Sequence, residues 1–152
     1  MQKLDVLAHE WVVVCDGHKA LILENLGDAR FPNLRCREER EQEDPPTREQ
    51  GTSAPGRVQP SVGTARSAVE QTDWHQLAEQ RFLGALAHDL DAAVAEGNAK
   101  GVIIVAPPRA LGVLRLAYTS RLRSALKAEV DKDYVKAPIY EIEAQLFGSA
   151  AG

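Results

Sequence analysis

The sequence has no apolar run long enough to cross a membrane. Near the beginning of the chain only Trp11 to Cys15 is continuously apolar, whereas a membrane helix needs about 20 such residues. The opening residues also lack the charged-then-apolar layout of a secretory signal, because Asp5, His9 and Glu10 interrupt them. These absences predict a cytoplasmic protein that does not enter a membrane.

Cysteine is scarce. The chain has 2 cysteines, Cys15 and Cys36, and neither belongs to a CxxC pattern. This spacing excludes a disulfide framework and a cysteine-based zinc site. We expect both thiols to be reduced, structural and buried like small apolar side chains. The residue patterns predict no metal site and no cofactor.

The chain also lacks the positive charge typical of proteins that bind nucleic acid broadly. Its net charge is −4 and its pI about 5.6, which argues against general electrostatic binding to nucleic acid or to anionic membranes. A local basic patch is an alternative, because Arg115, Arg121, Arg123 and Lys127 are close in sequence. A solvated helix face explains this group equally well. A length of 152 residues predicts one domain, 1–152.

The first third of the sequence predicts three antiparallel strands. Asp16-Gly17 separates the apolar runs Trp11 to Cys15 and Lys19 to Glu24, which is a hairpin signal. The first run is apolar on both faces, so we expect it near the centre of the sheet. Leu34 to Glu41 carries many charges, which favours an edge strand.

The rest of the chain predicts helices alternating with parallel strands. A helical stripe runs from Asp73 to Glu96 and ends at Gly97-Asn98. The remaining predicted elements are a buried strand at 102–106, a helix at 109–118, a strand at about 125–131 and a helix opened by Pro138. The fold class is therefore α/β, a mixed sheet of about five strands with helices packed on it.

The stretch 44–75 is predicted to be a long inserted loop. Its prolines and glycines favour no regular element before about Ser67, and loops of this length are usually functional or disordered. Capping-box patterns at Ser67 and Asp73 predict helix starts at its end. The candidate binding residues are Arg48, Glu49, Gln50, Gly51, Arg57, Arg66 and Trp74, with Arg109 from the exit of the buried strand. Arginines and glycines of this kind can hold a phosphate or carboxylate; the alternative is a mobile surface excursion.

Three residues are candidates for catalysis: Asp16, Asp73 and His75. His75 could act as a general base beside the loop, and Asp16 could join other carboxylates in binding divalent metals. Simpler roles compete with these, because Asp73 can be a helix N-cap and Asp16-Gly17 a turn. We therefore consider an enzyme less favoured than a binding protein.

Several blocks of the sequence resemble the bacterial host-attachment protein family. They are Trp11 to Gly17, Pro45 to Arg57, Arg66 to Gln76, Val102 to Arg115 and Glu129 to Tyr134. The resemblance implies a protein required for attachment to host cells. That family in turn resembles the middle domain of archaeal and eukaryotic peptide-chain release factors, a ribonuclease-H-like α/β fold. In release factors the corresponding loop carries Gly-Gly-Gln, where this chain reads Arg48-Glu49-Gln50-Gly51-Thr52.

Three functions follow from the residues and the resemblance. The first is a host-attachment protein whose 44–75 loop contacts an unknown protein partner, with a homo-oligomer also open. The second is an RNA- or ribosome-associated factor related to release factors. The third is a metal-dependent hydrolase or nuclease that uses Asp16, Asp73 and His75.

Overall fold

The structure is a computed structural model of the chain. It describes residues 4–42 and 60–148, with the backbone alone for residues 60–73.

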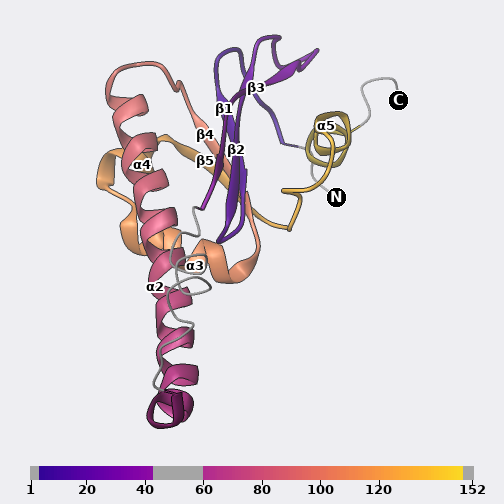
Figure 1. Ribbon diagram of the computed structural model, residues 1–152. Helices are drawn as coiled ribbons and strands as arrows, with labels where there is room; N and C mark the ends of the chain where they lie inside the picture. Colours follow the sequence, from indigo (N-terminus) through magenta and orange to yellow (C-terminus); the bar gives the residue numbers. More distant parts are fainter. Residues whose placement is uncertain (1–3, 43–59, 149–152) are drawn as a thin grey trace.

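Five strands form one mixed sheet (Figure 1). They are β1 (Trp11–Cys15), β2 (Lys19–Asn25), β3 (Leu34–Glu41), β4 (Val102–Ala106) and β5 (Leu126–Asp131), in the order β3-β2-β1-β4-β5. β1 pairs antiparallel with β2 and parallel with β4, and β4 pairs parallel with β5. The predicted mixed sheet is confirmed, with β1 at its centre and the charged β3 at one edge.

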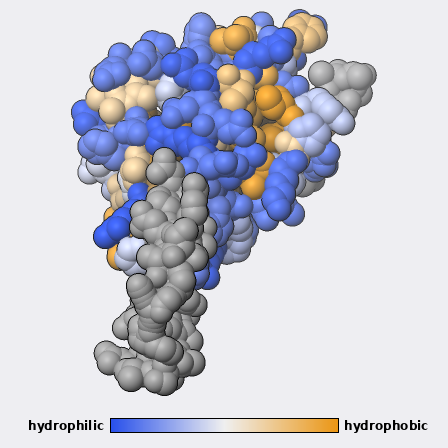
Figure 2. Space-filling view, viewed as in Figure 1, coloured by the Kyte–Doolittle hydropathy of each residue, from blue (hydrophilic) through white to orange (hydrophobic). Residues whose placement is uncertain are grey.

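Helices cover both faces of the sheet. α2 (Pro60–Ala95), α3 (Pro108–Ala117) and α4 (Ser120–Ala125) pack on one face, and α5 (Ile139–Phe147) packs on the other. β1 is buried on both sides, because Val13 and Cys15 face the first group of helices while Val12 and Val14 face α5. Among the helices that the structure describes, α5 is the one that packs on this second face, together with residues that precede β1 and α5. Figure 2 shows hydrophobic residues at the surface among hydrophilic ones. None of the helices that the structure describes is both long and apolar enough to cross a membrane.

The short helix α4 was not predicted. Thr119 caps it, because its Oγ1 accepts a hydrogen bond of 3.0 Å from the backbone N–H of Leu122. The buried Leu122 anchors the helix in the core. The periodicity of six residues is too short to separate a helix from a strand.

α2 begins earlier than the sequence predicted. Residues 60–75 form the first part of the helix rather than the end of a loop, and Pro60 is its first residue. A proline at the first helical position loses nothing, because the N–H there has no partner within the helix. The prediction that Asp73 caps the start of a helix is therefore wrong, since Asp73 lies in the helix interior.

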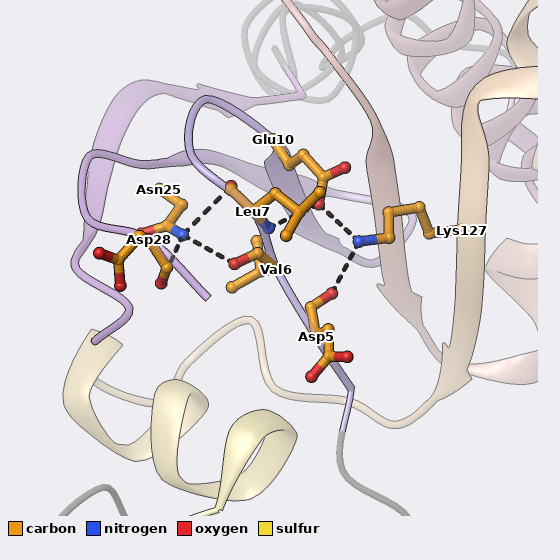
Figure 3. Close-up of polar contacts among 7 residues, drawn as sticks. All are labelled: Asp5, Val6, Leu7, Glu10, Asn25, Asp28 and Lys127. Carbon is orange, nitrogen blue, oxygen red and sulfur yellow. Dashed lines mark hydrogen bonds and ion pairs between the residues drawn. The ribbon is translucent and has the colours of Figure 1, made fainter. Parts of the chain in front are cut away.

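Asn25 fastens the N-terminal segment to the sheet (Figure 3). Its fully buried side chain donates hydrogen bonds to the carbonyls of Val6, Leu7 and Asp28. Lys127 of β5 reaches the same segment, because its Nζ lies 2.6 Å from Oε1 of Glu10 and 2.9 Å from the carbonyl oxygen of Asp5. These polar contacts hold residues 5–10 between β2 and β5.

Both cysteines are free thiols, but they differ in exposure. Cys15 is buried in β1, as expected, whereas Cys36 on β3 is exposed. The prediction of two buried cysteines is wrong for Cys36, because the edge strand β3 keeps most of its side chains in solvent.

Candidate functional site at the carboxyl ends of β1 and β4

Asp16 directly follows β1 and shapes the turn into β2. Its Oδ1 accepts hydrogen bonds of 2.8 Å from the backbone N–H groups of His18 and Lys19. A carboxylate used in this way mimics the backbone of a turn. The structure thus assigns the first catalytic candidate a structural task. Within the side chains that the structure describes, no group of three metal-binding residues occurs.

Glu79 of α2 joins this turn to the start of α3. Its Oε1 lies 3.2 Å from Nη2 of Arg109, and its Oε2 lies 3.5 Å from Nε2 of His18. The Glu79 side chain is 16% exposed, whereas those of Arg109 and His18 are more than 60% exposed. The carboxylate is therefore held inside, with two basic groups at the surface around it.

Gly17 makes room for this carboxylate. A Cβ atom added at Gly17 would lie 2.9 Å from Cγ and Cδ of Glu79. The absence of a side chain at Gly17 therefore permits the close approach of Glu79 to the turn. Sequence reasoning missed Glu79, because it lies off the apolar stripe of its helix. The signal available was the glycine after a central strand, which marks a place where another group approaches closely.

The chain enters the segment 43–59 beside this turn. The backbone N–H of Gln42 donates to the carbonyl of His18 over 2.7 Å, and its side-chain amide donates to the carbonyl of Gly17 over 2.9 Å. The end of β3 is thus fixed to the turn that also holds Glu79. The candidate residues Arg48, Glu49, Gln50, Gly51 and Arg57 lie outside the described residues.

The first part of α2 extends past this end of the sheet (Figure 1). Because Glu79 contacts the turn at the end of β1, the helix from Pro60 to Ala78 continues beyond it, for about 28 Å at 1.5 Å per residue. The candidates Trp74 and His75 are exposed on this part. His75 precedes Glu79 by four residues and so shares its face of the helix.

The structure brings some of the predicted residues together and leaves others apart. Asp16 and Arg109 lie at the same end of the sheet but do not contact each other. Asp16 accepts a hydrogen bond from His18, His18 lies beside Glu79, and Glu79 pairs with Arg109. Trp74 and His75 lie on the adjoining helix. The side chains of Arg66 and Asp73 lie outside the described part of the chain. The arrangement places the exposed guanidinium of Arg109, which pairs with Glu79, at the start of α3, and the N-terminus of a helix favours an anion.

A family model matches most of the chain. It is described as bacterial archaeo-eukaryotic release factor family 12, and it matches residues 9–146. The chain matches none of the curated proteins with which it was compared. The match agrees with the relation to release factors that the sequence resemblance implied, while attachment to host cells stays a prediction. With the match covering every strand and nearly all of the last helix, the chain belongs to bacterial archaeo-eukaryotic release factor family 12.

Proposed function

We propose that the protein is an RNA- or ribosome-associated factor related to peptide-chain release factors. The observation that carries this proposal is the family match over residues 9–146. The mixed five-stranded sheet agrees with the α/β fold that the resemblance to the release-factor middle domain implies.

The order of elements supports the proposal. The segment 43–59 lies between β3 and α2, which is where the release-factor middle domain carries its Gly-Gly-Gln loop. The tripeptide itself is absent from this sequence. We therefore propose association with RNA or the ribosome, and not peptide release by that tripeptide.

The distribution of charge also favours a nucleic-acid partner. The protein is acidic as a whole, but from Pro107 to Ala128 its only charged residues are basic: Arg109, Arg115, Arg121, Arg123 and Lys127. In the structure four of these residues pair with carboxylates, namely Arg109, Arg115, Arg121 and Lys127. Among the described residues no ion pair offsets the charge of Arg123, so this arginine supplies the local positive charge to which a phosphate would be directed.

The test is sedimentation of a native lysate, probed for this protein with and without ribonuclease. The proposal predicts co-migration with ribosomal particles, abolished by ribonuclease. Co-migration should also weaken with increasing salt. Changing Arg48 and Arg57 to Ala should weaken it if the segment between β3 and α2 contributes to the contact.

Migration as a small free species in both samples would contradict the proposal. The search would then turn to a protein partner of the segment 44–75. If the protein does co-migrate with ribosomal particles, attachment to host cells becomes an indirect effect of a role in translation.

A further inference from the structure

A pocket opens beside β5, away from the end of the sheet described above. Its volume is about 420 Å³, within the range of small-molecule pockets. Its lining comes from α3, α4 and β5: Arg115, Tyr118, Arg123, Leu126, Lys127, Ala128 and Glu129. The lining thus contains three basic side chains and one acidic side chain.

Glu129 is already neutralised within the wall of this pocket. Its Oε1 accepts hydrogen bonds from Nε and Nη2 of Arg115 at 3.0 and 2.7 Å, and its Oε2 accepts one from the hydroxyl of Tyr118 at 2.7 Å. The hydrogen bonds from Arg115 outweigh burial, so the pKa of Glu129 is lowered. Its negative charge is therefore matched by Arg115 and does not repel an anion on its own.

Lys127 is also occupied. Its ammonium group binds the buried carboxylate of Glu10 over 2.6 Å, and this contact offsets its charge. Lys127 therefore lines the pocket but offers an anion no uncompensated positive charge.

Arg123 is the third basic residue in the pocket lining. Among the described residues no carboxylate lies within ion-pair distance of it; its Nη2 donates only to the carbonyl of Arg115, over 3.2 Å. Its guanidinium lies 5.4 Å from the centre of the Tyr118 ring, and the residue is exposed. One face of the guanidinium is thus supported by an aromatic ring, while its N–H groups remain available to a ligand.

A guanidinium held in this way fits two parts of a nucleotide. Its N–H edge matches the oxygens of a phosphate. Its open face can stack on a base, as arginine planes do when proteins bind single-stranded RNA. We propose that this pocket binds one nucleotide of a single-stranded RNA, with the phosphate on the edge of Arg123 and the base on its exposed face. This inference rests on the proposed association with RNA.

The test compares two arginines of α4 in the full-length protein. Arg123→Gln removes the cation of the pocket, whereas Arg121→Gln removes an equal charge from an exposed arginine that pairs with Asp91 and does not line the pocket. Binding of a short fluorescein-labelled single-stranded RNA is measured by fluorescence anisotropy. We expect Arg123→Gln to raise Kd about tenfold, the effect of one charge-assisted hydrogen bond, and Arg121→Gln to leave it unchanged.

Two further readouts separate binding from folding. Loss of one phosphate contact should reduce the slope of log K against log salt concentration by about 0.7, with an unchanged melting temperature. Arg123→Lys should restore part of the affinity, because lysine keeps the charge but loses the planar stack. Equal affinities and equal slopes for Arg123→Gln and Arg121→Gln would overturn the proposal.

The source of the nucleotide is tested with uridine monophosphate. Free nucleotide that binds as tightly as the RNA and is lost in Arg123→Gln would overturn the RNA assignment and make the site a mononucleotide site. If the wild-type protein co-migrates with ribosomes but Arg123→Gln and Arg121→Gln bind RNA equally well, the nucleotide site is contradicted and the proposed function is not. Wild-type protein that neither co-migrates nor binds RNA would contradict the proposed function as well.

Discussion

The hydroxyl of Tyr118, at the end of α3, donates a hydrogen bond of 2.7 Å to Oε2 of Glu129 on the edge strand β5. This contact ties a helix that follows β4 to the strand next to it in the sheet. Arg115 of α3 makes a contact of the same length to this carboxylate, because its Nη2 donates to Oε1 of Glu129 over 2.7 Å.

Replacing Tyr118 with Phe should destabilise the protein by about 1.5 kcal/mol, because the ring stays in place while a charged acceptor loses one donor. The free energy of unfolding is measured by urea denaturation. Tyr140→Phe is the matched control, since Tyr140 is 75% exposed and should change nothing. An equal effect of the two substitutions would show that the Tyr118 hydroxyl contributes no net stability.

Stability should fall in acid through Glu129. Hydrogen bonds from Arg115 lower its pKa in the folded state below the ordinary value of 4.5. A lowered pKa gives stability that is present above the unfolded value and is lost as pH falls through the folded one. We expect the free energy of unfolding to decline below about pH 4.5, and to decline less steeply in Glu129→Gln. Parallel pH profiles for the two proteins would exclude this carboxylate as a source of the decline.

Two glycines should respond in opposite directions to alanine. A Cβ atom at Gly27 would collide with the backbone carbonyl oxygen of Phe31, which cannot move aside without changing the turn, whereas nothing lies within 4 Å of one added at Gly84. Gly27→Ala should destabilise the protein by more than about 2 kcal/mol. Gly84→Ala, inside α2, should stabilise it by about 0.5 to 1 kcal/mol. Thermal melting of the two variants checks both signs, and a Gly27→Ala variant as stable as the parent would contradict the turn geometry.

The two thiols should react at different rates. Burial raises the pKa of Cys15 to about 12, so almost none of it is thiolate at pH 8, and the thiolate is the reactive form. Cys36 is exposed. Iodoacetamide should therefore label Cys36 in the native protein and Cys15 only after unfolding, as read by mass spectrometry of the peptides. Rapid labelling of Cys15 in the folded state would show that β1 opens without global unfolding.

The sheet could be predicted from the sequence because buried strand positions are occupied by apolar residues and exposed ones by polar residues. Val12 to Val14 are apolar on both faces and lie at the centre, whereas β3, at an edge, is mostly charged and exposed. The strand β5 was harder, since half of its residues are charged: Lys127 and Asp131 are exposed, and the partly buried Glu129 contacts Arg115. Its prediction depended on completing the α/β layers.

The start of α2 could not be predicted because local signals there point to more than one place. Pro60 reads as a helix breaker in isolation, and Asp73 reads as a cap, yet the helix runs through both positions. The candidate site was not predicted from the sequence for a different reason. The contact between Glu79 and Arg109 joins residues 30 positions apart, so it exists only once the helices are packed.

The central place of β1 has a consequence for the order in which the chain folds. Trp11 pairs with Glu24 on one side, 13 positions along the chain, and with Val102 on the other, 91 positions along. Bringing β1 and β4 together closes a longer stretch of chain and therefore loses more conformational entropy than forming the β1–β2 hairpin. We therefore expect the hairpin of β1 and β2 to form early, and the rate of folding to depend on when β4 arrives to complete the parallel half of the sheet.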